Sequence, residues 1–168
     1  MATPLRFMRG SGRDGRPSML DVWMTTAHVL ARRSTCPRAR VGAVLCTPTW
    51  ELVATGYNGA PSGQAHCDDV GCLEVDGGCA RGAHAEVNAL LQAAKRGAAV
   101  GGSMLVVTHR PCLRCAVALA SAGVTRAWWA ATTGPGYSQA EAVDRVFVGA
   151  GITGSLAAYA AVPPVEAL

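Results

Sequence analysis

Strand-like and helix-like segments alternate through the second half of this 168-residue chain. Runs of apolar, β-branched and aromatic residues predict strands over 103–109 and 124–132. Apolar residues at helical spacing predict helices over 84–96, 112–123 and 138–151. A helix that connects two neighbouring strands of one sheet makes them parallel and covers a face of the sheet. The alternation therefore predicts a parallel α/β arrangement for this half.

The first half predicts an antiparallel pair of strands. A helix is expected over 18–36, and Ser18 is a residue type that caps helices well. Expected strands over 39–47 and 51–57 follow it. The turn between these strands is too short for a parallel crossover. Residues 58–82 have no hydrophobic period and predict a long loop, which in a compact domain should be functional or tied down. With a weak strand or coil over 152–162, the sum is an α/β fold with a mixed sheet and helices on both faces.

The composition is that of one globular domain. Half of the residues are hydrophobic, and no run of about eighteen or more apolar residues indicates a membrane span. We expect a disordered basic tail over 1–17 and a single domain over 18–168. The tail holds four arginines against Asp14, or +3 of the net charge of +4. The remaining +1 argues against a nucleic-acid partner, and the absence of a signal-peptide pattern favours a cytoplasmic protein.

The cysteines indicate metal rather than disulfides. Their number is odd, and no secretory signal accompanies them, so a disulfide framework is not expected. Cysteines that cluster near histidine in a cytosolic chain are typical of metal binding. The seven are Cys36, Cys46, Cys67, Cys72, Cys79, Cys112 and Cys115.

Two short motifs at the starts of expected helices predict one catalytic metal site. "HAE" at 84–86 and "PCLRC" at 111–115 place His84, Cys112 and Cys115 where two adjacent helices begin. Three protein ligands leave one position of a tetrahedral zinc ion open for water, which is the arrangement of a catalytic site. Helix N-termini favour thiolate over thiol, and Pro111 suits a first helical turn because its missing N–H costs nothing there. A lone C-x-x-C could equally belong to a structural zinc site or a redox pair.

Glu86 is the expected proton carrier. It lies two residues from His84, so it can point beside the metal position without sharing it. Zinc lowers the pKa of a bound water to about 7, and a neighbouring carboxyl can take that water's proton and pass it on as general acid and base. H-x-E followed by P-C-x-x-C is the signature of zinc deaminases.

Four segments resemble the deoxycytidylate (dCMP) deaminases of the cytidine deaminase superfamily. They are "RRSTCPRARVGAVL", "ATGYNGAPSGQAHCDDVGC", "CARGAHAEVNALLQAAKRG" and "VTHRPCLRCAVALASAGV", which together fall roughly within residues 20–130. The resemblance implies a three-layer α/β/α fold with a mixed sheet of about five strands. It also implies hydrolysis of dCMP to dUMP and ammonia, with His84, Cys112 and Cys115 as zinc ligands and Glu86 as proton shuttle. Family members often form homo-oligomers, including hexamers.

The same resemblance suggests substrate contacts. Asn58 of "GYNG" matches a residue that contacts the substrate's sugar, and Arg40 is a candidate phosphate contact or, equally, a solvated strand-end arginine. Arg38, Arg110 and Arg114 also lie close to the motifs. Where relatives carry aromatic and acidic residues, this chain has "WWAATTGPGY". Neighbouring residues of a strand point to opposite faces, so at most one of Trp128 and Trp129 faces the substrate; Tyr137 could add stacking surface.

A second, structural zinc ion is also implied by the resemblance. Cys36 and Cys67 fall where some relatives place ligands of such an ion, and Cys72 and Cys79 would complete a closed four-thiolate site. That site would tie down the long loop. Free thiols, or His66 in place of one cysteine, are the alternatives. Cys46, within an expected strand, reads as a core thiol.

Three functions remain open from the sequence. The first is deamination of a small cytosine nucleotide, with a related nucleoside or a specialised-metabolite nucleotide as variants. The second is deamination of a base in nucleic acid, which needs a basic groove. The third is a non-catalytic zinc-binding module, against which Glu86 and the three-ligand count both argue. The preference between ribose and deoxyribose, and regulation by dCTP or dTTP, also stay open.

Overall fold

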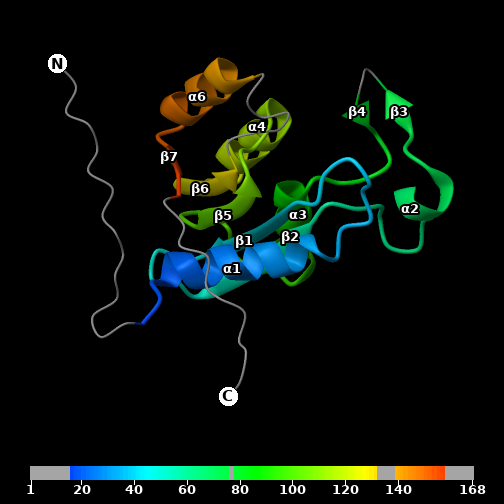
Figure 1. Ribbon diagram of the computed structural model, residues 1–168. Coiled ribbons are helices and arrows are strands. Elements are labelled where there is room, and N and C mark those ends of the chain that lie inside the picture. Colours follow the sequence, from blue (N-terminus) through cyan, green and yellow to red (C-terminus); the bar gives the residue numbers. More distant parts are fainter. Residues whose placement is uncertain (1–15, 76–77, 132–138, 158–168) are drawn as a thin grey trace.

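A five-stranded mixed sheet forms the centre of the computed structural model, which describes residues 16–75, 78–131 and 139–157 (Figure 1). The helices are α1 (Met19–Ala31), α2 (Cys67–Val70), α3 (Ala85–Lys95), α4 (Leu113–Ser121) and α6 (Ala140–Gly149). The strands are β1 (Gly42–Cys46), β2 (Leu52–Tyr57), β3 (Glu74–Val75), β4 (Gly78–Cys79), β5 (Met104–His109), β6 (Arg126–Ala131) and β7 (Thr153–Leu156). No helix within the described residues is both long enough and apolar enough to cross a membrane.

The sheet joins an antiparallel half to a parallel half. The strand order is β2-β1-β5-β6-β7. Strand β1 pairs antiparallel with both β2 and β5, whereas β5, β6 and β7 run parallel. The predicted antiparallel pair and the predicted parallel second half are both confirmed. The segment expected as weak strand or coil contributes β7 as an edge strand.

Helices cover the two faces of the sheet unequally. Met24 and Ala27 of α1 pack against Val44 and Val106 on one face. On the other face α3, α4 and α6 contribute to the larger apolar cluster, with buried residues that include Ala89, Leu119 and Phe147. Figure 1 shows α1 on the opposite side of the sheet from α4 and α6. The predicted three-layer α/β/α fold is therefore confirmed.

The start of α1 agrees with its sequence. Ser18 caps the helix: its hydroxyl accepts from the backbone N–H of Asp21, and the Asp21 carboxylate accepts from the backbone N–H of Ser18. This reciprocal pair satisfies two of the N–H groups that a helix start leaves without a partner. The helix ends at Ala31, earlier than its pattern suggested, and the chain then turns toward Pro37.

The segment predicted as a loop over 58–82 is more ordered than expected. It contains the one-turn helix α2 and the strands β3 and β4, which pair Glu74 with Cys79 in a small separate ladder. Elements of two to four residues are too short to leave a hydrophobic period, so the sequence pattern could not reveal them. The prediction of a segment without structure was wrong for these residues.

The two tryptophans of β6 point to opposite faces, as the sequence predicted. Trp129 is 5% exposed and lies in the cluster beneath α3, α4 and α6. Trp128 lies on the α1 face and stacks on Trp50, with ring centroids 5.4 Å apart. Tyr137 and residues 1–15 of the tail expected over 1–17 lie outside the described residues, so their expected roles stay predictions.

At Gly42 the backbone of α1 lies directly against the sheet. A Cβ added there would come 1.9 Å from the backbone oxygen of Ala27 and 2.7 Å from the backbone nitrogen of Ala31. We expect Gly42→Ala to lower the free energy of unfolding by ~1–3 kcal/mol, because overpacking forces backbone to shift. Chemical denaturation measures this loss. Gly149→Ala is the matched control, since nothing lies within 4 Å of its added Cβ. Equal stability of the two variants would contradict the close packing.

Candidate metal centre

The starts of α3 and α4 bring the predicted catalytic ligands together. His84 is the N-cap of α3 and Cys112 the N-cap of α4, both with extended backbone (φ −69°, ψ 155° and φ −74°, ψ 169°). Neither side chain caps its own helix, so both are available for other contacts. Pro111 is buried but precedes the cap, so it lies outside the helical turn in which the sequence placed it. The extended conformation of Cys112 accounts for that difference.

The three donor atoms have the spacing that a tetrahedral metal needs. His84 Nδ1 lies 3.4 Å from Cys112 Sγ and 3.4 Å from Cys115 Sγ. All three atoms lie within 4.8 Å of one another. Zinc bonds of about 2.1 Å to nitrogen and 2.3 Å to sulfur would set a tetrahedral N–S separation of about 3.6 Å. The residues present therefore fit a zinc ion. His84 is exposed and Cys115 buried, so the group opens to solvent on one side.

The electrostatics of the group favour one thiolate. Hydrogen bonds from Cys115 and His84 outweigh burial and lower the pKa of Cys112 to about 4. The hydrogen bond between Cys115 and Cys112 raises the pKa of Cys115, and burial is the next largest cause of that rise. The Cys112 side chain raises the pKa of His84, because it accepts a hydrogen bond from the imidazole. A site that already holds an anion next to a bound proton can exchange the proton for a metal cation.

Glu86 lies in the first turn of α3 and is 4% exposed. Burial raises the pKa of its carboxyl above the ordinary value. Hydrogen bonds from its own backbone N–H and from Cys115, together with the charge of His84, oppose that shift without cancelling it. The group is thus a buried carboxyl that holds a proton more readily than a solvated one.

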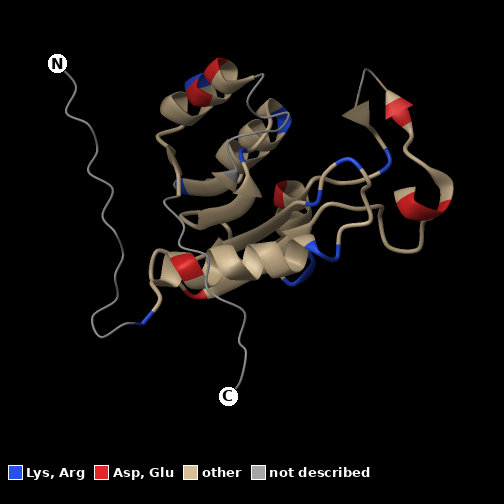
Figure 2. Cartoon of the chain, viewed as in Figure 1, with Lys and Arg blue, Asp and Glu red and all other residues tan. Residues whose placement is uncertain are grey.

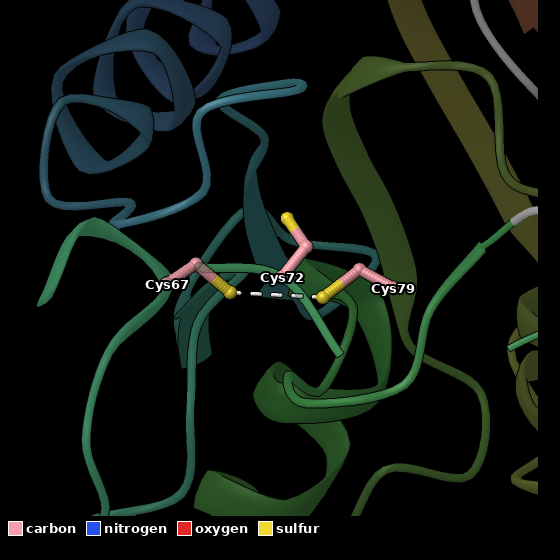
Figure 3. Close-up of side chains that lie close together, drawn as sticks. All are labelled: Cys67, Cys72 and Cys79. Carbon is pink, nitrogen blue, oxygen red and sulfur yellow. Dashed lines mark hydrogen bonds between the residues drawn. The ribbon is translucent and has the colours of Figure 1, made fainter. Parts of the chain in front are cut away.

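Three of the four cysteines expected at the second site also come together. The sulfurs of Cys67, Cys72 and Cys79 lie within 4.8 Å of one another, and Cys67 Sγ is 3.6 Å from Cys79 Sγ (Figure 3). The separation for two thiolates on one tetrahedral zinc is about 3.8 Å. The three cysteines come from α2, β4 and the chain between them.

Cys36 does not join that group of three. It lies on the connection between α1 and β1. Its charge raises the pKa of Cys72, after burial and the contacts with Cys79, while the hydrogen bond with Cys67 lowers that pKa. It is therefore a neighbour of the cluster without being within its 4.8 Å spacing. His66, the alternative ligand, forms a 3.2 Å hydrogen bond through Nδ1 with Thr35 Oγ1.

Asn58 holds the connection that leads into β1. Its Oδ1 accepts from the backbone N–H of Val41 at 2.8 Å, and its Nδ2 donates to the backbone oxygen of Ala39 at 2.8 Å. The side chain both donates and accepts, as its chemistry suggested, but these partners are backbone groups. A sugar contact would be additional to this clamp. The sequence pattern did not reveal the clamp, although a lone Asn directly after a strand is a residue type that bonds to nearby backbone.

Sheet register places the substrate candidates at the same end of the sheet as the metal group. Ala43 lies opposite Val107 and Gly42 opposite Tyr57. The start of β1, the end of β2 and the end of β5 therefore lie at the same end of the sheet. Arg40 is exposed just before β1, and Figure 2 shows basic residues along the connection between α1 and β1. Arg38 forms an exposed ion pair with Glu74 at 3.8 Å.

Arg110 and Arg114, which lie on either side of Cys112 in the chain, differ in their surroundings. Arg114 is exposed in the first turn of α4, and its charge is the smallest of the causes acting on the pKa of His84, which it lowers. Arg110 is instead turned inward, where it ion-pairs with Asp144. Among the arginines considered as phosphate contacts, Arg110 is therefore the least available to bind a phosphate group.

The chain matches a known family over most of its length. The sequence model for the "Cytidine and deoxycytidylate deaminase zinc-binding region" matches residues 17–131. ComE operon protein 2 of Bacillus subtilis is 44% identical over 115 residues, which are 68% of this chain and 60% of that protein. Deoxycytidylate deaminase of Schizosaccharomyces pombe is 36% identical over 118 residues, 65% of this chain and 36% of that protein. The chain thus spans less than two thirds of the length of these relatives.

Solved structures show the same architecture. The dCMP deaminase of cyanophage S-TIM5 in apo form is 29% identical, with a TM-score of 0.69 over 84% of this chain and 99% of that one. A crystal structure of the same phage protein in complex with dCMP and dUMP is 28% identical, also with a TM-score of 0.69.

Proposed function

The chain belongs to the cytidine and deoxycytidylate deaminase family, and from that premise we propose that it is a zinc-dependent enzyme that hydrolyses dCMP to dUMP and ammonia. One observation carries the proposal. His84, Cys112 and Cys115 converge at two helix starts, with the buried carboxyl of Glu86 two residues from the histidine. Three protein donors leave a coordination position open, and a carboxyl beside it can move a proton.

His84, Cys112 and Cys115 would hold the zinc ion. When bound, zinc supplies a water that is acidic enough to act as nucleophile at neutral pH. The helix starts contribute because their positive ends favour the charge of the thiolates. Cys115 is buried and His84 is exposed, so the group is accessible from the side of His84. That access is where a cytosine ring would enter.

Glu86 would carry the protons. Its carboxylate would take a proton from the attacking water and deliver it to ring nitrogen N3. It would then take a second proton, from the hydroxyl now on C4, and deliver it to the amine, which leaves as ammonia while the C4 carbonyl forms. The raised pKa suits this cycle, because a general acid and base works best with a pKa close to the working pH. A bound metal cation would offset part of that rise.

The substrate assignment rests on the relatives. The phage protein of the same fold was crystallised with dCMP and dUMP, and relatives from fission yeast and from mycobacteriophage D29 are deoxycytidylate deaminases. We propose Arg40 as a phosphate contact and Asn58 as a sugar contact, since both lie at the end of the sheet where α4 begins. The homo-oligomer and the cytoplasmic location remain predictions from the sequence.

We propose a structural zinc ion at Cys67, Cys72 and Cys79, with Cys36 as the fourth ligand. The three sulfurs lie within 4.8 Å of one another, with 3.6 Å between those of Cys67 and Cys79. The influence of Cys36 on the pKa of Cys72 supports its place near the group. A closed thiolate site would fix the α2 and β3–β4 segment to the connection after α1.

Metal analysis tests this second site without any substrate. Protein purified without chelator should contain two zinc ions per chain, since two separate donor groups are present. In the zinc-loaded protein, Cys72 and Cys79 should resist a thiol reagent that labels them after chelation. A single zinc ion together with freely reactive Cys72 and Cys79 would remove the second site.

A substrate panel separates the candidate functions. Ammonia release is measured with dCMP, CMP, deoxycytidine, cytidine and a short cytosine-containing oligonucleotide. The proposal expects dCMP to be the best substrate. Preference for the oligonucleotide would assign the chain to nucleic-acid deamination, and inactivity of zinc-loaded protein toward all five would favour a binding module.

A further inference from the structure

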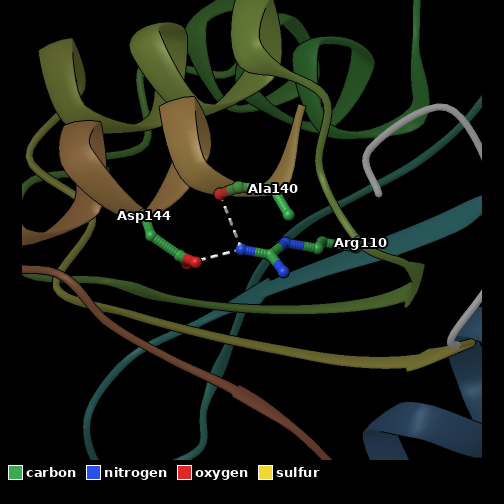
Figure 4. Close-up of polar contacts among 3 residues, drawn as sticks. All are labelled: Arg110, Ala140 and Asp144. Carbon is green, nitrogen blue, oxygen red and sulfur yellow. Dashed lines mark hydrogen bonds and ion pairs between the residues drawn. The ribbon is translucent and has the colours of Figure 1, made fainter. Parts of the chain in front are cut away.

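The metal cysteine Cys112 is held from both sides by the start of α6. Two residues before it, Arg110 Nη2 donates to the backbone oxygen of Ala140 at 3.1 Å and ion-pairs with the Asp144 carboxylate (Figure 4). One residue after it, the backbone N–H of Leu113 donates to Gln139 Oε1 at 3.1 Å. Both contacts link the short turn that carries Cys112 to a helix some thirty residues away in the chain.

The Arg110 side chain is held in one orientation by its surroundings. The Arg110 side chain is 10% exposed, and its guanidinium carbon lies 5.1 Å from the centroid of the Trp129 ring. A planar guanidinium that stacks on an indole and binds two oxygens has little freedom to reorient. On the outer side of the same helix, Arg145 pairs with Glu141. These two side chains are 79% and 82% exposed, so their ion pair contributes little to stability.

Gln139 supplies an acceptor for the first backbone N–H group of α4. The first N–H groups of a helix have no partner within the helix, and an N-cap side chain normally reaches the second or third of them. The first, that of Leu113, donates to the amide oxygen of Gln139. The sulfur of Cys112 lies 3.4 Å from His84 Nδ1. The Gln139 bond therefore ties the turn that carries Cys112 to the N-cap of α6.

We propose that Arg110 and Gln139 are positioning residues that fix the direction of the Cys112 thiolate, with Asp144 and Trp129 holding Arg110 in place. The inference rests on the proposed metal centre, and it assigns to the N-terminal turn of α6 a part in that centre. Partners that orient a metal ligand typically change metal affinity or activity by ~10–100-fold when they are removed.

Protection of Cys112 by zinc tests the proposal at the site itself. Wild type, Arg110→Met and Gln139→Ala are loaded with zinc and treated with iodoacetamide at increasing chelator concentration, and peptide mapping follows alkylation of Cys112. We expect each variant to lose protection at a ~10–100-fold lower chelator concentration than wild type. The kcat for dCMP should fall by a similar factor with little change in KM. Arg145→Met, on the exposed side of α6, should match wild type in both readouts.

The alternatives give different results. Wild-type protection and kcat in Arg110→Met and Gln139→Ala, even with a lower melting temperature, would overturn the proposal and leave the contacts with α6 without a part in the metal centre. A change confined to KM would overturn it in favour of a substrate contact. If Arg110→Met does not fold, Asp144→Asn and Gln139→Ala decide in its place. The alkylation readout stays valid if dCMP is not the substrate, so it separates this inference from the proposed function.

Discussion

Glu86→Gln should abolish turnover of dCMP while the protein keeps its zinc. The amide fills the same space in a position that is 4% exposed, but it cannot take up or release a proton. Loss of general acid and base catalysis costs ~10²–10⁴-fold, and one residue that serves several proton transfers can cost more. Steady-state kinetics with zinc content measured on the same sample give both halves of the result.

The matched control for this substitution is Glu141→Gln. Glu141 lies on α6 with a side chain that is 82% exposed and pairs with Arg145 on the surface, so the same chemical change should leave kcat and KM unaltered. Near-normal turnover by zinc-loaded Glu86→Gln would exclude the carboxyl as the proton carrier. Loss of zinc from this variant would instead show that Glu86 supports the metal ligands.

A phosphorylated substrate should be preferred over its nucleoside by a wide margin. A charge-assisted contact between arginine and phosphate contributes ~1.5–3 kcal/mol, which corresponds to roughly ten-fold to more than a hundred-fold. We therefore expect kcat/KM for dCMP to exceed that for deoxycytidine by at least this order. Arg40→Ala should shrink the ratio, mainly by lowering kcat/KM for dCMP.

Arg126→Ala provides the control for the charge of Arg40. Arg126 is exposed and is the first residue of β6. It pairs with Met104 at the start of β5, so it lies at the opposite end of the sheet from Cys112, which follows the end of β5. Its removal should leave the ratio unchanged. Equal turnover of dCMP and deoxycytidine by wild type would overturn the nucleotide assignment and leave the zinc chemistry standing.

The local parts of this molecule could be read from its sequence. Ser18 predicted the start of α1, and the short turn before β2 predicted an antiparallel pair, because each depends on neighbouring residues. The motifs at His84 and Cys112 predicted two helix starts that meet, because the helices that follow parallel strands begin at the same end of the sheet. The adjacent positions of Trp128 and Trp129 predicted that their rings would point apart.

Long-range partners could not be read in the same way. Arg110 binds Asp144, which lies 34 positions further along the chain, and no local pattern marks that pair. The backbone hydrogen bonds that join Asn58 to Ala39 and Val41 were also not predicted, and its contact with the sugar stays a prediction. Cys36 was expected to be equivalent to Cys67, Cys72 and Cys79, but the structure holds only the latter three within 4.8 Å of one another. These features depend on tertiary packing.

Isotope tracing of the product tests hydrolytic deamination most directly. Zinc-loaded protein is incubated with dCMP in water labelled with oxygen-18, and mass spectrometry identifies the product while ammonia is measured in the same sample. We expect dUMP that carries one labelled oxygen, with one ammonia released for each dUMP, and a reaction that stops on chelation and resumes with added zinc. Unchanged dCMP, or dUMP formed equally fast by the chelated protein, would contradict a zinc-dependent dCMP deaminase.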